Sequence, residues 1–542
     1  MHRRALWLIA AFTIVATQAH GDQHSNPPWA PSLMAFEHYD SGRTHLFERA
    51  RFGGSFGGCN SVDVRAADAS YPSGYNMVYR NPSEIFIYGG GYGNVPNSIG
   101  PYVAKVDPNT LEPIWYTQLL VTAEVHEWNY PGVVALMNDD FLYVIYGYRL
   151  ARIDPADGSF EVMELPYDTT VGAANTSYNG FDALSDGTLV AKTVFRNPNC
   201  DMLQGPDGLF KCPCAAEVPP SMLVSIDPCK LQVLDQVTLP QPVGGRPTTA
   251  RFQGKDFVYL ATPTTAIRYE VQDGMFTLDT SWNPGNIYYS GQTVGSAVAI
   301  MNNWFVVQSN GNPAMAPLSV IAIHQGNASQ MHRLQPFSGL PVVQPTTPGF
   351  PATVVSWAPM SVSVDPDHNV IYTADSYPSA IAAVKLTASG LHTLWTAQQR
   401  TTEFLAIIGP RGRRVLVTTD FPGQPPYYNT TDEVVWRNAQ TGEELARTAE
   451  ALPAMTAGTM IQPYYFRKIF YMGQEGELFS LKARPTSCAG DLDQDGSVGG
   501  ADLAVMFSLW GGPSDADLND DAHTDGADLT MLLSAWGPCG TN

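Results

Sequence analysis

Charge, and positive charge above all, is scarce in this sequence. Only 15% of the 542 residues are charged, and 30 Lys and Arg stand against 51 Asp and Glu, for a formal net charge of −21. Nucleic acids and anionic membrane surfaces are bound through clustered Lys and Arg, so neither is an expected partner. Hydrophobic residues make up 44% of the chain, which is enough for a packed interior and too much for a disordered protein.

Long apolar runs are nearly absent. The one clear run, residues 5–16, follows two arginines and precedes the small residues Thr17 and Ala19. This order is typical of a secretory signal peptide, and the run is short for a membrane span. We therefore expect a signal peptide over residues 1–21 and a mature chain without a membrane span. The expected location is secreted, extracellular or at the cell surface.

Recognisable catalytic motifs are also lacking. The sequence has no Gly-x-Ser-x-Gly elbow, no His-Glu-x-x-His pair and no glycine loop of the kind that binds phosphate. It therefore names no reaction type.

Cysteines are few, and a secreted chain is expected to use them in disulfides. Cys488 and Cys539 bracket the C-terminal segment, and we expect them to pair. Four more cysteines lie close together, and their spacing lacks the paired C-x2-C of common zinc modules. We expect two local disulfides rather than zinc in this group, which consists of Cys200, Cys212, Cys214 and Cys229. Cys59 is left over, and its state stays open.

Glycine, proline and aromatic residues are plentiful, which indicates many short strands joined by turns. A pattern of four strands recurs through the body, and the turn between the third and fourth strands returns as Asp107-Pro, Asp154-Pro and Asp227-Pro. A repeated four-stranded unit is typical of a β-propeller, because one blade cannot bury both of its faces alone. The sequence predicts an all-β, eight-bladed propeller, with seven blades as the alternative.

The blade pattern also divides the chain. The last blade shows only three strands over residues 458–483, so we expect residues 61–65 to supply its fourth strand. The predicted divisions are a signal peptide over 1–21, an N-terminal extension over 22–59, the propeller over 60–484 and a small helical module over 485–542.

The C-terminal module contains ten aspartates and no Lys or Arg. Its oxygen-bearing residues follow the spacing of a calcium loop twice, and a hard cation prefers such oxygen ligands. Two Ca²⁺ sites are therefore predicted. The expected ligands of the first are Asp491, Asp493, Asp495, Ser497 and Asp502, and those of the second are Asp517, Asn519, Asp521, His523, Asp525 and Asp528. The first loop has Gly496 at its sharp turn, whereas the second has Ala522 there.

Each loop runs into a short apolar helix, and the two helices are close to copies, so we expect Trp510 to pack against Trp536. Paired loops and helices of this kind resemble a dockerin-type module. The resemblance implies a cohesin-like or other cell-surface partner. The positions that choose the partner in that family are here Gly-Ala pairs at 500–501 and 526–527, without the hydroxyl pairs often seen.

The body resembles the quinoprotein-dehydrogenase-like propeller superfamily in blade number and turn style. Adjacent cysteines and the repeated tryptophan docking motifs of the quinone-binding members are lacking. Bound pyrroloquinoline quinone is therefore not expected.

Ligand sites of propellers gather at the mouth of the central channel, on the links between blades. The link over residues 124–130 is the densest in functional groups, and the alternative is that its aromatic rings plug the channel. The catalytic candidates, as acid, base or metal ligand, are His126, Glu127, Arg246 and Arg400. The candidates for binding a carbohydrate or aromatic ligand are Trp128, Tyr130, Tyr178, Asn179 and Trp357.

Two classes of function follow. The first is a non-catalytic binding or surface-attached scaffold, or a part of an extracellular polysaccharide-handling system. The second is an extracellular oxidoreductase, lyase or hydrolase with its site at the channel mouth. The sequence favours the first, because no catalytic set can be read from it.

Overall fold

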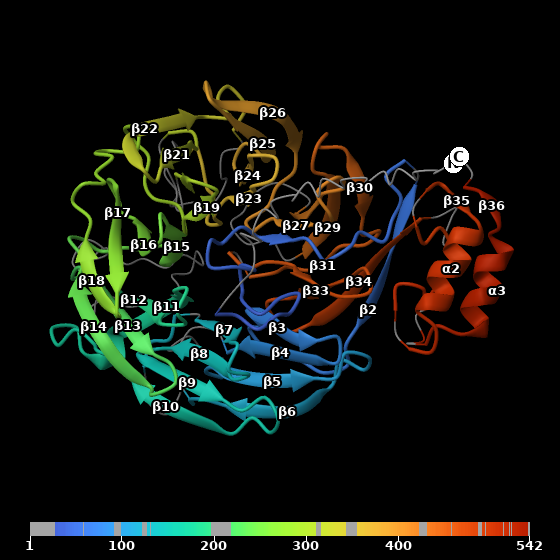
Figure 1. Ribbon diagram of the computed structural model, residues 1–542, viewed down its shortest axis with the longest axis horizontal. Helices are drawn as coiled ribbons and strands as arrows, with labels where there is room; N and C mark the ends of the chain where they lie inside the picture. Colours follow the sequence, from blue (N-terminus) through green and yellow to red (C-terminus); the bar gives the residue numbers. More distant parts are fainter. Residues whose placement is uncertain are drawn as a thin grey trace, which may run out of the picture.

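The computed structural model describes residues 28–57, 59–90, 99–121, 127–130, 132–196, 218–309, 316–342, 355–421, 431–456, 458–485, 490–493, 495–512, 514–519, 521 and 523–539. The predicted signal peptide and most of the cysteine-rich insertion lie outside these residues. Eight antiparallel sheets stand side by side in a ring, and a small helical module lies beside the ring (Figure 1). The predicted eight-bladed propeller is confirmed, and the seven-bladed alternative is wrong.

Each of the first four blades is a four-stranded meander. Blade 1 holds β3 (Asn76–Asn81), β4 (Glu84–Gly89), β5 (Tyr102–Val106) and β6 (Pro113–Gln118). Blade 2 holds β7 (Val133–Leu136), β8 (Leu142–Tyr146), β9 (Arg149–Ile153) and β10 (Phe160–Glu164). Blade 3 follows the short helix η1 (Ala173–Asn175) and holds β11 (Thr176–Ala183), β12 (Leu189–Phe195), β13 (Met222–Asp227) and β14 (Gln232–Thr238). Blade 4 holds β15 (Thr248–Phe252), β16 (Lys255–Ala261), β17 (Ala266–Gln272) and β18 (Met275–Leu278).

The other four blades continue the ring. Blade 5 holds β19 (Ala299–Met301), β20 (Trp304–Gln308), β21 (Val320–His324) and β22 (Asn327–Leu334). Blade 6 holds β23 (Ser363–Asp365), β24 (Val370–Asp375), β25 (Ala380–Thr387) and β26 (Gly390–Gln398). Blade 7 holds β27 (Ala406–Ile408), β28 (Val415–Asp420), β29 (Thr431–Asn438) and β30 (Glu444–Arg447), and is extended by β1 (Leu46–Phe47) and β31 (Leu452–Pro453). Blade 8 holds β32 (Gln462–Pro463), β33 (Lys468–Met472), β34 (Leu478–Pro485) and β2 (Asn60–Ala66).

Burial follows position within a blade. All five residues of β8 are buried, whereas β10 at the outer edge of the same blade is mostly exposed. The outermost strand β14 alternates between exposed and half-buried residues. The cores therefore lie between the inner strands of adjacent blades, as expected for sheets that bury their faces against their neighbours.

The repeated turn between third and fourth strands has one geometry. The N–H groups of Leu111 and Gly158 donate to the carbonyls of Asp107 and Asp154, four residues earlier, at 2.8 and 2.9 Å. The Asp107 carboxylate also accepts from the amide of Asn109 at 2.8 Å. This bond stabilises the turn in which the chain reverses direction. The last residue of each turn is left-handed, with φ of 64° at Leu111 and 76° at Gly158.

The ring is closed by a strand from the N-terminal side, as predicted. Strand β2 pairs antiparallel with β34 along its whole length, from Asn60 opposite Pro485 to Ala66 opposite Phe479. The eighth blade thus combines the two ends of the propeller.

The extension before β2 runs through the middle of the ring (Figure 1). We call residues 29–47 the channel segment. It is mostly buried, and its final strand β1 pairs in parallel with β27. Hydrogen bonds join the channel segment to the innermost part of seven blades. The Arg43 side chain bonds Phe181 and Pro247. The main chain of the segment bonds Tyr79, Leu136, Ile300, Val364 and Ile407. The amide of Leu33 donates to the hydroxyl of Tyr465 in blade 8 at 3.1 Å. The segment fills the centre that a ring of eight blades leaves open.

The C-terminal module contains two helices, α2 (Gly500–Ser508) and α3 (Gly526–Ser534), and a small ribbon of β35 (Ser497–Val498) and β36 (Gly537–Pro538). Its core holds Leu492, Val498, Met506, Ala516, Leu518 and Leu532. Trp510 and Trp536 stay out of this core, with 45% and 51% of their surface exposed. The expected packing of one tryptophan against the other is wrong, because the smaller aliphatic residues already fill the space between the helices.

Among the described residues, no helix is long and apolar enough to cross a membrane.

Candidate functional site

A polar cluster lies at the centre of the ring. The channel segment contributes Glu37, His38, Arg43 and His45 to it, and the blades contribute Tyr75, Asp182 and Arg246. We call these seven residues the ring-centre cluster. All four side chains from the channel segment are almost fully buried. Buried charges of this kind are tolerated only where they are paired and hydrogen-bonded.

Glu37 and Arg246 form the strongest pair of the ring-centre cluster. Their side chains are in direct contact, and the Arg246 guanidinium also donates to the hydroxyl of Tyr75 at 2.7 Å. Burial alone would raise the pKa of Glu37, but the charge of Arg246, with His38 and Arg43, brings this pKa well below its ordinary value. Burial likewise acts to lower the pKa of Arg246, and Glu37 outweighs it and raises that pKa. Both groups are therefore charged at neutral pH.

Two histidines continue the cluster toward blade 6. His38 Nδ1 lies 2.6 Å from His45 Nε2, and His45 Nδ1 lies 2.8 Å from the hydroxyl of Ser363. Burial lowers the pKa of His38 to about 4, although the Glu37 carboxylate, 3.1 Å from Nε2, acts to raise it. Burial also lowers the pKa of His45, and the nearby His38 and Arg43 act in the same direction. Both rings are therefore neutral at pH 7.

Arg43 and Asp182 complete the cluster on the side of blade 3. Arg43 donates to the carbonyls of Pro247 and Phe181 at 3.0 and 3.2 Å, and its Nε lies 3.9 Å from the Asp182 carboxylate. Asp182 accepts from the amide of Thr249 at 2.9 Å. Burial raises the pKa of Asp182 to about 7 against these contacts. The ring-centre cluster thus anchors the channel segment to the blades through groups of the protein itself.

The described part of the predicted channel-mouth link, residues 127–130, makes contacts within the protein. His126 lies outside the described residues. Glu127 forms a two-pronged ion pair with Arg149, one contact of which is 3.0 Å. The Trp128 ring is buried and meets the Tyr130 ring edge-on, with centroids 5.9 Å apart. Burial raises the pKa of Tyr130, and the charge of Arg246 lowers it in part, so Tyr130 lies next to the ring-centre cluster.

The remaining candidates lie in two parts of the ring, with Tyr178 and Asn179 on β11 of blade 3 and Trp357 and Arg400 beside blade 6. The Tyr178 hydroxyl donates to the Pro166 carbonyl at 2.7 Å, and the Asn179 amide donates to the Gly244 carbonyl at 2.8 Å. The amide of Trp357 donates to the Asp375 carboxylate at 3.0 Å. The Arg400 guanidinium donates to the Ser379 hydroxyl and lies over the Phe421 ring. Among the candidates that the structure describes, Arg246 belongs to the ring-centre cluster and Tyr130 lies next to it.

Sequence reasoning missed the channel segment. Six charged residues and two histidines lie between positions 37 and 51, in a chain with little charge. That density, outside the repeats and next to a closing strand, was a signal for a polar core at the ring centre.

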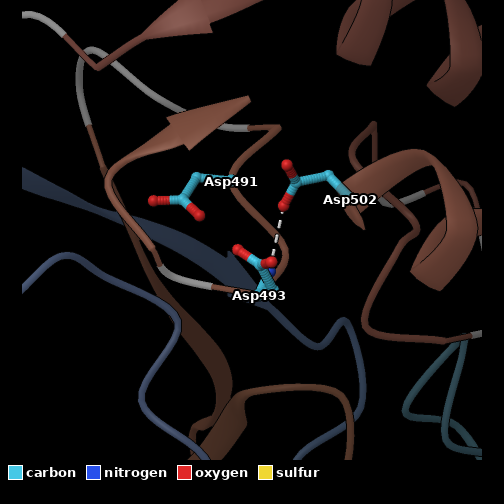
Figure 2. Close-up of side chains that lie close together, drawn as sticks. All are labelled: Asp491, Asp493 and Asp502. Atoms are coloured by element: carbon cyan, nitrogen blue, oxygen red, sulfur yellow. Dashed lines mark hydrogen bonds between the residues drawn. The ribbon is translucent and has the colours of Figure 1, made fainter. Parts of the chain in front are cut away.

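The first loop of the C-terminal module brings three carboxylates together (Figure 2). One oxygen each from Asp491, Asp493 and Asp502 lies within 4.8 Å of the others. Asp502 is buried and accepts from the amides of Leu492 and Asp493, at 2.6 and 3.0 Å, which fixes its position at the base of the loop. Gly496 has φ of 94°, the left-handed turn that a calcium loop requires at this point.

The second loop repeats this construction. Asp528 is buried and accepts from the amides of Leu518 and Asn519 at 2.7 and 3.1 Å, just as Asp502 does in the first loop. Asp525 accepts from the amide of Ala527 and caps α3. The amide of His523 donates to Asp521 at 2.9 Å. Ala522 lies outside the described residues, so the expected strain at its turn stays a prediction.

The module is attached to blade 8 through basic side chains. Arg467, Lys482 and Arg484 donate to the carbonyls of Leu492, Asp517 and Leu518 at 2.9, 3.2 and 2.6 Å. These acceptors all lie at the start of the two acidic loops. Burial lowers the pKa of Lys482 to about 7, and the neighbouring Arg484 acts in the same direction. The acidic module therefore faces a basic part of the propeller.

The cysteine predictions have mixed outcomes. Cys539 is disulfide-bonded, but Cys488 lies outside the described residues, so their pairing stays a prediction. Cys229 is exposed and carries a free thiol, at odds with two local disulfides in its group. The other three members of that group, Cys200, Cys212 and Cys214, lie outside the described residues.

Comparison with known proteins identifies the fold only. No family model and no curated protein matches the chain. A quinohemoprotein alcohol dehydrogenase from Comamonas testosteroni is similar in structure, with a TM-score of 0.51 and 9% identity over 83% of this chain and 80% of that one. Another such dehydrogenase, from Pseudomonas putida HK5, has a TM-score of 0.49 and 11% identity over 86% and 81%. BamB from Moraxella catarrhalis has a TM-score of 0.42 and 9% identity over 78% and 97%. The chain thus shares a β-propeller fold with these proteins, and at these identities the likeness is one of fold alone.

Proposed function

We propose that this protein is an extracellular, non-catalytic scaffold, in which the propeller is the rigid body and the C-terminal module is a calcium-dependent attachment unit. One observation carries the proposal: the channel segment occupies the centre of the ring, and its charged groups bond to the blades. A flat cofactor such as pyrroloquinoline quinone would need the space that this segment fills, which favours a body without that cofactor.

The C-terminal module supports the attachment role. Each of the two loops is fixed by a buried aspartate, Asp502 in the first and Asp528 in the second, and each carries oxygen ligands at the spacing that suits a Ca²⁺ ion, with Asn519 in the second loop at the place of Asp493 in the first. Cations would also offset the repulsion within a segment of ten aspartates and no Lys or Arg. The dockerin-like reading of this module rests on these repeated loops and helices.

The exposed side chains of the module favour a protein partner. Phe507 in α2 and Trp510 just after α2 are about half exposed. Leu533 and Trp536, at the equivalent positions in and after α3, are also about half exposed. Two equivalent apolar pairs on one small module would suit a cohesin-like or other cell-surface protein, since aromatic side chains often anchor such interfaces.

Calcium titration of the full chain tests the attachment role. Isothermal titration should show two binding events, of which Asp502→Asn removes the first and Asp528→Asn the second. Asp68→Asn, an exposed carboxylate on the propeller, is the control and should change neither. Absence of binding at millimolar calcium would overturn the calcium part of the proposal.

A substrate panel tests the non-catalytic role. The purified full chain is incubated with polysaccharides and with aromatic and alcohol substrates, with and without added metals. We expect no turnover. Turnover that Arg246→Met abolishes, in a variant that still folds, would place a reaction at the ring centre and overturn the scaffold.

A further inference from the structure

A cleft of about 520 Å³ lies where the propeller, the end of the N-terminal extension and the C-terminal module meet. The propeller side contributes Arg49, Arg51 and Arg467, and the module contributes Trp510 and Asp515. The volume is in the range of small-ligand sites. The predicted sites include none of these residues.

The side chains that line the cleft have a net positive charge, whereas the protein as a whole is negatively charged. Three arginines and one aspartate line it, although the chain as a whole has a net charge of −21. Arg49 and Arg51 are exposed, and within the described part of the chain their hydrogen bonds go to main-chain carbonyls, those of Ser32 and of Glu48 and Ala50. A guanidinium has five N–H donors, so both retain donors for an anion.

Arg467 is held more firmly at the base of the cleft. It donates to the carbonyl of Leu492 at 2.9 Å, and its Nε lies 3.7 Å from the Asp515 carboxylate. Arg467 and its neighbour Phe466 both have left-handed backbones, with φ of 60° and 59°. The two residues are the central pair of the hairpin turn between β32 and β33, a tight turn that requires positive φ at both positions. The turn places both residues at the cleft.

The aromatic side chains give the cleft a second kind of contact. Trp510 is 45% exposed, and Tyr464, Tyr465 and Phe466 line the propeller side. Flat aromatic faces stack on sugar rings, and Ser508 and Ser514 add hydroxyl groups beside them. Arginine forks recognise carboxylates and sulfates through paired hydrogen bonds.

We propose that this cleft binds an acidic saccharide, a polysaccharide segment that carries carboxylate or sulfate groups. The arginines bind the anionic groups, and Trp510 stacks on a sugar ring. Because one wall belongs to the propeller and the other to the module, a bound saccharide holds the two together.

The test uses the full chain in calcium-containing buffer. Isothermal titration and tryptophan fluorescence follow binding of an oligogalacturonate, a sulfated chondroitin oligosaccharide and a neutral cello-oligosaccharide. We expect binding of at least one acidic probe, weakening with added salt, and none of the neutral one. The tighter of the two acidic probes identifies the preferred anionic group.

Two variants locate the site. Arg49→Gln with Arg51→Gln should weaken binding about tenfold or more, the usual effect of losing charge-assisted hydrogen bonds. Trp510→Ala should weaken it and remove the fluorescence change. Trp536→Ala, the equivalent exposed tryptophan on the other helix, and Arg251→Gln, a surface arginine elsewhere, are matched controls and should leave binding unchanged.

Three results would overturn the proposal. They are no binding of either acidic probe, equal weakening by Trp510→Ala and Trp536→Ala, or equally tight binding of polyglutamate, which would mean charge attraction without sugar recognition. Calcium titration of the variant with Arg49→Gln and Arg51→Gln distinguishes a failure of this proposal from a failure of the proposed attachment role. An unchanged calcium isotherm with lost saccharide binding assigns the effect to the cleft.

Discussion

His38 and His45 face one another at the centre of the propeller, with 2.6 Å between Nδ1 of the first and Nε2 of the second. The His45 amide also donates to the His38 carbonyl at 3.2 Å, so the two contacts together close a bend in the channel segment. It has consequences for stability because both rings are neutral in the folded protein.

The first prediction concerns acid. The pKa of His38 is lowered from 6.5 to about 4 on folding, so the unfolded chain binds the additional proton between these values. The contribution of His38 to stability is therefore complete above pH 6.5 and is lost as the pH falls toward 4, by roughly 3 kcal/mol in all. His38→Asn, which cannot be charged, should flatten the loss over this window.

Thermal unfolding at pH 7 and at pH 4.5 measures the effect. The drop in melting temperature between the two should be smaller in His38→Asn than in the parent protein. His392→Asn, an exposed histidine, should behave like the parent. Parallel pH curves for all three proteins would contradict the prediction.

The second prediction concerns the buried pair of Glu37 and Arg246. Arg246→Met leaves Glu37 charged without its partner in a buried place, which costs about 3 to 5 kcal/mol. Glu37→Gln combined with Arg246→Met should cost less than the sum of the two single changes. Denaturant unfolding of the four proteins gives the coupling energy.

The exposed pair of Lys255 and Glu270, 2.8 Å apart, supplies the comparison. Lys255→Met should cost less than about 1 kcal/mol, as surface pairs do. Additive effects of Glu37→Gln and Arg246→Met would mean that the two residues act independently.

The third prediction concerns the attachment of the module to blade 8. Arg484 donates to the Leu518 carbonyl at 2.6 Å and contacts Asp63 of β2. Arg484→Gln combined with Arg467→Gln removes two of the contacts that hold the module. The radius of gyration from small-angle scattering should then increase, while Arg251→Gln should leave it unchanged. High salt should increase it in the parent protein, since the contacts join parts of opposite charge.

The fourth prediction concerns the repeated turn. Gly158 has φ of 76°, and a Cβ there would lie 2.5 Å from Thr117 Oγ1 and 2.8 Å from the Trp115 ring. Gly158→Ala should therefore destabilise the protein by about 1 to 3 kcal/mol, from backbone strain and crowding together. Gly187→Ala is the comparison: its φ of 90° brings strain, but nothing lies within 4 Å of its Cβ, so its cost should be smaller. Equal unfolding free energies for the two variants would contradict the crowding argument.

The fold could be predicted from the sequence because its signals are local and repeated. The Asp107, Asp154 and Asp227 turns are each fixed by contacts within five residues, so they are visible in the sequence one at a time. The missing strand of the last blade indicated that residues 61–65 must return to it, and β2 does so. The carboxylates of Asp491, Asp493 and Asp502 came together for the same reason, since their spacing alone brings them close.

The ring centre could not be predicted in this way. Glu37 and Arg246 are in contact although most of the first half of the chain separates them in the sequence. His45 and Ser363 are in contact although more than half of the chain separates them. Such contacts depend on how the channel segment bends inside the closed ring, which no local pattern encodes. The cleft beside Trp510 depends likewise on the position of the module against blade 8.

The pairing of β2 with β34 determines when the propeller ring can close during synthesis of the chain. Strand β2, which completes the last blade, is made long before its partner β34, because the other seven blades lie between the two strands in the sequence. Until then the early blades have an open edge, and the channel segment has few of the neighbours that bury its charges. Closure over such a long loop is slow, so the nascent chain must spend its synthesis time with unpaired strand edges, which are prone to aggregate.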